Sequence, residues 1–128
     1  MTLDGALNHY LTTLTGLEAY WLERPNPADN AIVYRCLSPG MLPSNLAKLA
    51  IHDDSYSITV YHTDPDVGKQ LADLISQSLH DFSGELNSET ASAYTIQLAS
   101  FSGGFDQPLT GESGQRSYQF NRDFVFNH

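Results

Sequence analysis

Apolar and polar side chains alternate along the last part of the chain, residues 115–126. Tyr118, Phe120, Phe124 and Phe126 occupy even positions, and the odd positions between them are polar except for Val125. Successive side chains of a strand point to opposite faces, so this period of two predicts a long strand with one buried aromatic face. A chain that places such a strand at its end, without a chemical motif nearby, favours a role in shape and assembly.

Four other segments have the composition or the alternation of strands. They are residues 17–24, 31–37, 55–63 and 91–101. The second of these is almost wholly apolar, which predicts burial on both faces, and the third alternates strictly. Gly103 and Gly104 predict the end of the fourth strand. Residues 103–114 are therefore predicted to form a loop that leads into the C-terminal strand.

Two segments repeat apolar residues at helical spacing. The first covers residues 3–14, with Thr2 as N-cap and Gly16 as stop. The second is preceded by Asp64, which can cap it, and begins with Pro65, which suits the first helical position. Its apolar stripe continues to Phe82 and ends before Gly84. A stripe of this width predicts a helix packed on a sheet.

Residues 38–54 contain two prolines and a glycine early in the segment, and we expect a loop with one short helix. The predicted order is helix, two strands, this loop, strand, helix, two strands, in a single domain covering residues 1–128. Strands grouped around two helices indicate an α+β fold. We expect the two helices to pack on one face of a mainly antiparallel or mixed sheet of about five strands.

Composition narrows the possible partners. The chain has 128 residues, with 15 Asp and Glu against 6 Lys and Arg, for a formal net charge of −9. Binding to phosphates depends on clustered cations, so we expect no specific nucleic-acid binding. No apolar run approaches membrane-spanning length and no signal-peptide pattern is present, which predicts a cytoplasmic protein without a membrane partner. The single cysteine, Cys36, excludes an intrachain disulfide and is expected to be a small buried hydrophobe.

The sequence contains no specific signal for catalysis. None of the five histidines pairs with another at helical ligand spacing, so we expect no metal site and no cofactor. The nucleophile-elbow and phosphate-loop motifs are both missing from the sequence. We therefore expect a protein that is not an enzyme and has no catalytic residues.

Two alternatives remain open at this point. The first is a ferredoxin-like module that binds a small molecule in a pocket lined by Tyr20, Tyr56 and Tyr61. The second is a small hydrolase built on His62 or His80 with nearby carboxylates.

Several apolar residues fall in segments rich in Gly, Pro and Ser, where exposure is usual. They are Met41, Leu42, Leu46, Phe105 and Leu109. Either they fold back onto the sheet, or they contact another subunit, since exposed apolar patches mark interfaces.

Two stretches resemble a known family. Residues 57–66, Ser-Ile-Thr-Val-Tyr-His-Thr-Asp-Pro-Asp, run into the amphipathic helix that ends at Phe82. This unit is similar to the strand–helix unit of tailed-bacteriophage tail terminator or tail completion (head–tail joining) proteins. Residues 105–110, Phe-Asp-Gln-Pro-Leu-Thr, followed by residues 114–126, resemble the closing hairpin of the same family. The resemblance covers most of the chain as a pattern of hydrophobicity.

The resemblance implies a structural virion component. Such proteins form a ring, usually a hexamer, at the head-proximal end of the tail tube, stop its growth and dock to the head connector. The implied partners are further copies of the chain, the tail tube protein and the head connector protein. The implied locations are the host bacterial cytoplasm during assembly and then the virion. The expected interface residues are Met41, Leu42 and Leu46 from the first long loop, and Phe105, Leu109 and Arg116 from the second.

Overall fold

The computed structural model describes residues 2–26, 30–40, 51–110 and 116–128, with the backbone alone for Thr110. Its elements are α1 (Leu3–Thr15), β1 (Ala19–Trp21), β2 (Ala31–Ser38), β3 (Asp53–His62), α2 (Pro65–Leu79), β4 (Phe82–Leu86), β5 (Tyr94–Thr110) and β6 (Arg116–Asn127). The strands form one six-stranded sheet in the order β1-β2-β3-β6-β5-β4. Only β1 and β2 are parallel, so the sheet is mixed and the α+β prediction is confirmed, with six strands in place of five.

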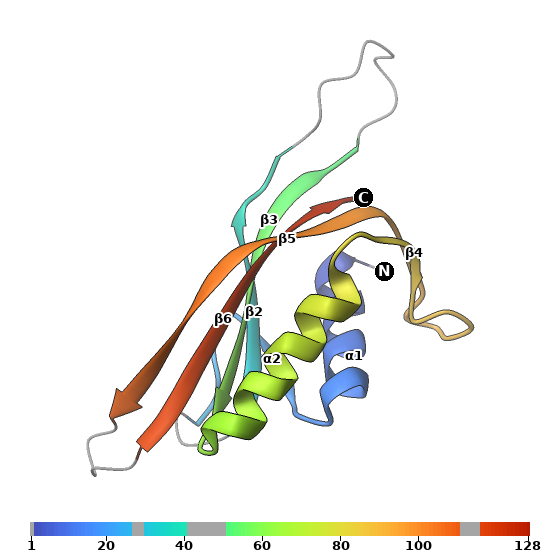
Figure 1. Cartoon of the computed structure of the whole chain (residues 1–128). Helices are drawn as coiled ribbons and strands as arrows, with labels where there is room; N and C mark the ends of the chain where they lie inside the picture. The colour runs from blue at the N-terminus through green and yellow to red at the C-terminus, as the bar shows by residue number, and fades with distance from the viewer. Residues whose placement is uncertain (1, 27–29, 41–50, 111–115) are drawn as a thin grey trace.

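Both helices lie against the same face of the sheet (Figure 1). Helix α1 buries Leu3, Ala6, Leu7 and Leu11, and α2 buries Gly68, Ala72, Ile75 and Leu79. Facing them, β6 contributes its even-numbered aromatic residues to the core, which confirms the predicted buried face of that strand. No helix in the described part of the chain is long and apolar enough to cross a membrane.

The predicted helix starts are confirmed. The Thr2 hydroxyl accepts a hydrogen bond from the backbone N–H of Gly5, and Gly16 ends α1 in the left-handed conformation with φ of 76°. Asp64 accepts hydrogen bonds from the N–H groups of Asp66 and Val67 at the start of α2. Side-chain caps of this kind satisfy N–H groups that the helix itself cannot pair.

The predicted end of α2 is wrong. The helix stops at Leu79, and the chain turns through Asp81, which has a positive φ of 57°. Phe82 then begins β4, a strand that was not predicted from the sequence, and Gly84 lies inside that strand with φ of 138°. Phe82 continues the apolar stripe of α2 in sequence, but it packs against the core from the sheet.

The predicted loop at residues 103–114 is also wrong over its first part, because β5 continues to Thr110 and pairs with β6 along that length. The pair has a bulge between Phe101 and Gly103, and Gly103 has φ of 144°. A Cβ atom on Gly104 would collide with the carbonyl oxygen of Asn121 on β6. The two glycines therefore allow a bulge and a close backbone approach within a strand, where the sequence suggested a turn.

The first two strands differ from their predictions in extent. Strand β1 covers only Ala19–Trp21 of the predicted residues 17–24, and Leu22 has a positive φ of 74° that ends the strand. Strand β2 matches its prediction in position, but only its first four residues are buried. Arg35 and Leu37, on the second half, are exposed, so the prediction of burial on both faces is wrong there.

Candidate functional site: the open face and the free edge of the sheet

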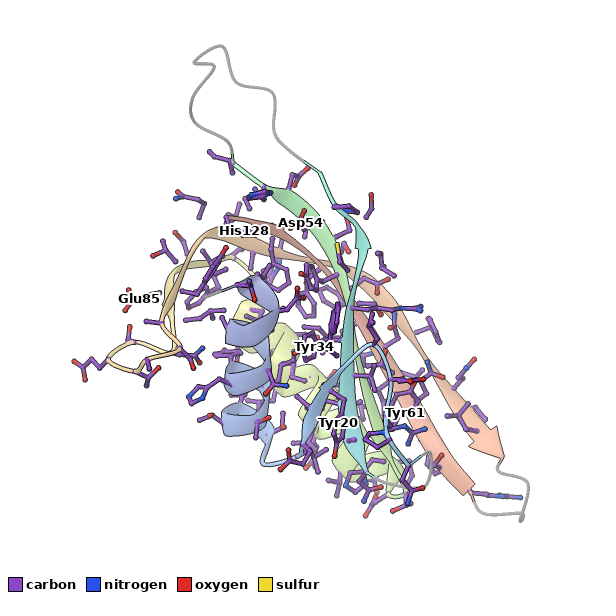
Figure 2. All side chains as sticks on the ribbon, turned by 180° about the vertical axis from the view of Figure 1, so that it is seen from behind. Tyr20, Tyr34, Asp54, Tyr61, Glu85 and His128 are labelled. Carbon is purple, nitrogen blue, oxygen red and sulfur yellow. The ribbon has the colours of Figure 1, made fainter. Side chains whose placement is uncertain are left out.

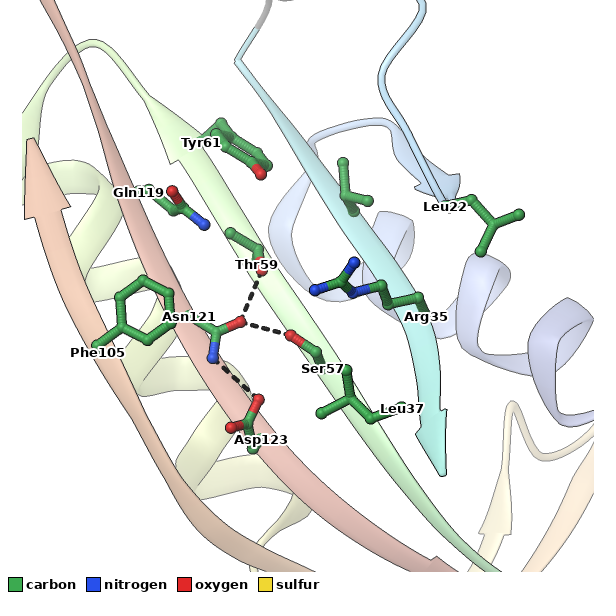
Figure 3. A pocket seen from close by; sticks show the side chains of 11 residues that line it. Leu22, Arg35, Leu37, Ser57, Thr59, Tyr61, Phe105, Gln119, Asn121 and Asp123 are labelled. Atoms are coloured by element: carbon green, nitrogen blue, oxygen red, sulfur yellow. Dashed lines mark hydrogen bonds between the residues drawn. The ribbon is translucent and has the colours of Figure 1, made fainter. Parts of the chain in front are cut away.

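The face of the sheet that the helices do not cover carries a hollow of about 260 Å³ (Figure 3). Its lining comes from strands β2, β3, β5 and β6 and from the residue that follows β1. The lining residues are Leu22, Val33, Arg35, Leu37, Ser57, Thr59, Tyr61, Phe105, Gln119, Asn121 and Asp123. The side chains alternate along each strand, so all of them reach one face.

The floor of this hollow is a buried polar network centred on Asn121. The Asn121 side-chain oxygen accepts hydrogen bonds from the hydroxyls of Ser57 and Thr59, and its amide donates to Asp123 Oδ1 at 2.9 Å (Figure 3). Asn121 is only 5% exposed. Buried polar groups are stable when they are paired, so these bonds fix the Asn121 amide and hold β3 to β6 through side chains as well as backbone.

The rim of the hollow is apolar and exposed. Leu22 and Leu37 lie on the β1–β2 side and are 52% and 49% exposed, and Phe105 on β5 is 50% exposed. Trp21, next to Leu22, is 57% exposed. Large apolar side chains gathered around a polar floor are typical of a surface that meets another protein.

Strand β5 has a long outer edge that no described strand covers. Strand β4 pairs with β5 only between Tyr94 and Ala99, whereas β6 pairs with β5 from Leu98 to Thr110 on the other side. An unpaired edge presents backbone N–H and C=O groups that can pair with another chain. Apart from the N–H of Phe101, which donates to His80 Nδ1, residues 100–110 of β5 are therefore a potential docking edge.

The hydrogen-bond register shows which residues face outward at this edge. Ile32 and Tyr34 of β2 bond to β1 through their backbone, so the neighbouring residues of β2 bond to β3. Alternation across β3 and β6 then directs the N–H and C=O of Gly104 and Asp106 away from the sheet. Pro108 has the same parity and has no N–H, as expected for proline at an edge position.

A second hollow, of about 490 Å³, separates this edge from α2. Arg122 of β6 lies at its base with its side chain 9% exposed, although it interrupts the aromatic face between Phe120 and Phe124. Its guanidinium donates to Asp106 on β5 and to Asp73 on α2, the latter at 3.4 Å. This ion-pair cluster ties α2 to the β5–β6 pair.

The predicted interface residues are distributed as follows. Phe105 lines both hollows, and it lies on strand β5 and not on the predicted loop. Leu109 also lies on β5, partly buried, and exposed Arg116 begins β6 opposite Thr110. Met41, Leu42 and Leu46 are outside the described residues. Phe105, Leu109 and Arg116 therefore belong to one β-hairpin, and their role as interface residues stays a prediction.

The tyrosines proposed for a small-molecule pocket do not share one. Tyr61 lies on the open face (Figure 3). The guanidinium carbon of Arg24 lies 3.7 Å from the centre of the Tyr61 ring. Tyr56 lies on the opposite, helix-facing side of β3, and its hydroxyl donates to Asp4 Oδ1 at 2.8 Å. Burial, together with this hydrogen bond to Asp4, raises the pKa of Tyr56. Tyr56 is thus a core residue.

The histidines proposed for a hydrolase have local structural partners. His62 Nδ1 accepts a hydrogen bond from the backbone N–H of Asp64, and His80 Nδ1 accepts one from the backbone N–H of Phe101. His80 also lies 3.4 Å from its neighbour Asp81. Within the described residues, no group of three potential ligands could hold a metal ion.

A buried chain of hydrogen-bonded side chains at one end of the sheet was not predicted from the sequence. His128 and Asp54 lie together at this end (Figure 2). His128 contacts Tyr94 through Nδ1 at 2.6 Å and Asp54 through Nε2 at 2.7 Å. Asp54 also accepts from the N–H of Gly40, and the ring of His52 stacks on His128. The side chains of His128 and Asp54 are 7% and 12% exposed, which indicates a structural link between β3, β5 and residue 128. Asp54, Tyr94 and His128 are too far apart in the sequence for any pattern of residue spacing to predict this contact.

Of three comparisons with known proteins, only the search of solved structures gives a match. A scan against protein-family models gives no match, and a search of curated proteins gives none. Among solved structures, the fold is similar to that of one chain in the virion of a native gene transfer agent (GTA) particle. The TM-score is 0.55 at 14% sequence identity, and the match covers 91% of this chain and 82% of that chain. At this identity the similarity shows a shared fold.

Proposed function

We propose that this protein is a structural component of a virion of the tailed-phage type, and specifically a tail terminator or head–tail joining protein. The observation that carries the proposal is the fold shared with a chain of the GTA virion over 91% of the present chain. The resemblance of residues 57–66, 105–110 and 114–126 to the tail terminator family supports the same role.

The surfaces described above are compatible with such a role. A joining protein works by binding its own copies, the tail tube and the head connector, so it needs exposed surfaces that can accept protein partners. The open face has an apolar rim of Leu22, Leu37 and Phe105, and β5 offers a backbone edge that no described strand covers. We propose that the protein acts through these surfaces and without a reaction centre or cofactor.

Deletion of the gene from the host that produces the particles tests this function. Electron microscopy of the deletion strain should show heads separate from tails, or tail tubes of uneven length, because nothing stops the tube or joins it to the head. Supplying the gene from a plasmid is the control and should restore joined particles. Normal, infectious or DNA-transferring particles from the deletion strain would contradict the proposed function.

A further inference from the structure

We propose that copies of this chain join head to tail, with the β5 edge surface of one copy against the β1–β2 edge surface of the next. The β5 edge surface consists of Phe101, Gly104, Phe105 and Asp106. The β1–β2 edge surface consists of Trp21, Leu22, Arg35 and Leu37. This inference rests on the proposed function, which requires self-association, and it assigns the surfaces that do it.

The two edges lie at the same level of the sheet. Paired residues form rows across β1, β2, β3, β6 and β5. One such row joins Trp21, Tyr34, Ile58, Arg122 and Gly104. The adjacent rows join Tyr20 to Phe105 and Ala19 to Asp106 in the same way. A neighbouring copy that is rotated about an axis along the strands therefore brings its β1 level with the outer edge of β5.

The strand directions favour this contact. Strand β1 is parallel to β2, and the pairs β2–β3, β3–β6 and β6–β5 are all antiparallel. Strands β1 and β5 consequently run in opposite directions. Rotation about an axis along the strands preserves direction, so β5 of one copy runs antiparallel to β1 of the next, and antiparallel pairing is the more stable kind. Contacts between two different surfaces are also what closes a ring.

The exposed apolar side chains are concentrated on these two edges. The four most exposed large hydrophobic residues in the described part of the chain are Trp21, Leu22, Phe105 and Leu37. Three of them belong to the β1–β2 edge surface and Phe105 belongs to the β5 edge surface. Each surface alone leaves aromatic or aliphatic groups in water, and contact between copies buries both sets.

The exposed apolar side chains distinguish this arrangement from a two-fold pairing of β5 with itself. Two β5 edges placed together would bury Phe105 of both copies but would leave Trp21, Leu22 and Leu37 in water. Charge gives no preference, because the Asp106 carboxylate lies on the helix-facing side of β5 and already pairs with Arg122 and Lys69, whereas Arg35 lies on the open face. The head-to-tail contact buries the apolar residues of both edges, which favours the β1–β2 edge of a second copy as the occupant.

The backbone pairing between copies is incomplete, which limits its strength. The outward carbonyl oxygens of Ala19 and Trp21 already accept hydrogen bonds from Asn8 Nδ2 and from the N–H of Glu23. On the other side, Pro108 has no N–H to donate. Side-chain contacts therefore carry the interface, and we expect weak association in dilute solution.

Cysteine crosslinking tests the assignment even for a weak contact. Glu18 and Gln107 are exposed; Gln107 lies on the row that joins residues 31, 61, 119 and 107, and Glu18 directly precedes Ala19, which lies on the adjacent row. The variants Glu18→Cys and Gln107→Cys are mixed at high concentration, oxidised and run on a non-reducing gel. We expect a crosslinked dimer in the mixture and none from either variant alone, because only the mixture places both thiols at one interface.

The controls separate a specific contact from random collision. Wild-type protein shows how much crosslinking the native Cys36 produces by itself. The Ser88→Cys variant supplies an exposed thiol in the turn after β4, away from both edges. Adding Phe105→Asp to the Gln107→Cys variant should remove the crosslink from the mixture, while circular dichroism stays unchanged. A mixture that crosslinks no better than the Ser88→Cys controls overturns the proposal, as does Gln107→Cys crosslinking equally well alone.

The two proposals fail in different ways. A missing crosslink combined with separate heads and tails in the deletion strain leaves the joining function in place and moves the interface elsewhere. A specific crosslink combined with normal particles in the deletion strain leaves the interface in place and removes the joining function.

Discussion

Replacing Arg122 with Met should cost less stability than replacing its partner Asp106 with Ala. The Arg122 side chain is 9% exposed, whereas the side chains of Asp106 and Asp73 are 40% and 46% exposed. Loss of the guanidinium leaves two carboxylates that water can reach. Loss of Asp106 leaves a buried positive charge without its nearest partner, which is the costlier outcome.

The structure gives the magnitudes. Arg122→Met keeps an unbranched apolar side chain next to the buried core and should change the free energy of unfolding by less than about 1 kcal/mol. Asp106→Ala removes a charge-assisted hydrogen bond, which is worth about 1.5–3 kcal/mol. Asp73 at 3.4 Å and the Asn121 carbonyl oxygen at 2.9 Å still contact the guanidinium, so we expect a loss of about 2 kcal/mol.

Urea unfolding followed by circular dichroism measures both variants, with the slope of free energy against urea held to the wild-type value. Lys69→Ala is the matched control. Its ammonium lies 3.8 Å from Asp73 and 3.7 Å from Asp106 but is 57% exposed, so its removal should cost less than about 0.5 kcal/mol. A greater loss for Arg122→Met than for Asp106→Ala would refute this account of the cluster.

Three further substitutions, one of them with a matched control, test other parts of the structure. Burial and the hydrogen bond to Asp4 raise the pKa of Tyr56, so its contribution to stability is complete below about pH 10 and is lost as the pH rises further. Tyr56→Phe should make urea stability fall less steeply above about pH 10, and an unchanged pH profile counts against the buried hydrogen bond. Gly104→Ala forces a Cβ against the Asn121 carbonyl oxygen and should cost about 3 kcal/mol by calorimetry. Gly16→Ala, which is strained in φ but meets nothing within 4 Å, should cost about 1 kcal/mol, and equal losses would contradict the close approach at Gly104. Asn121→Ala removes three side-chain hydrogen bonds and should cost about 2 kcal/mol in urea unfolding, whereas a loss below about 0.5 kcal/mol would mean that water replaces them.

Local chemistry allowed the helix starts and the C-terminal strand to be predicted from sequence. Thr2, Asp64 and Pro65 act through neighbours within three residues, so a single stretch of sequence carries the whole signal. The aromatic alternation of β6 is equally local, since a strand with one buried face repeats every two residues.

The remaining features depend on contacts between distant segments. Gly103, Gly104 and Pro108 have the composition of a turn, and only the close approach of Asn121 from β6 reveals that they lie within a strand. Phe82 fits the apolar stripe of α2, but pairing with Ala99 places it in β4. Phe105 was predicted as an interface residue from its apolar character in a Gly-rich segment, and this role stays a prediction. The β1–β2 edge surface was not predicted from the sequence, because its residues come together only once β1 pairs with part of β2.

Cryo-electron microscopy of purified particles from the producing host tests the central claim most directly. The account predicts a ring of copies of this six-stranded fold at the head-proximal end of the tail, with neighbouring copies in contact through the β5 edge and the β1–β2 edge. A complete head–tail joint that is built without this chain, in particles that otherwise contain every component of the tail, would contradict it.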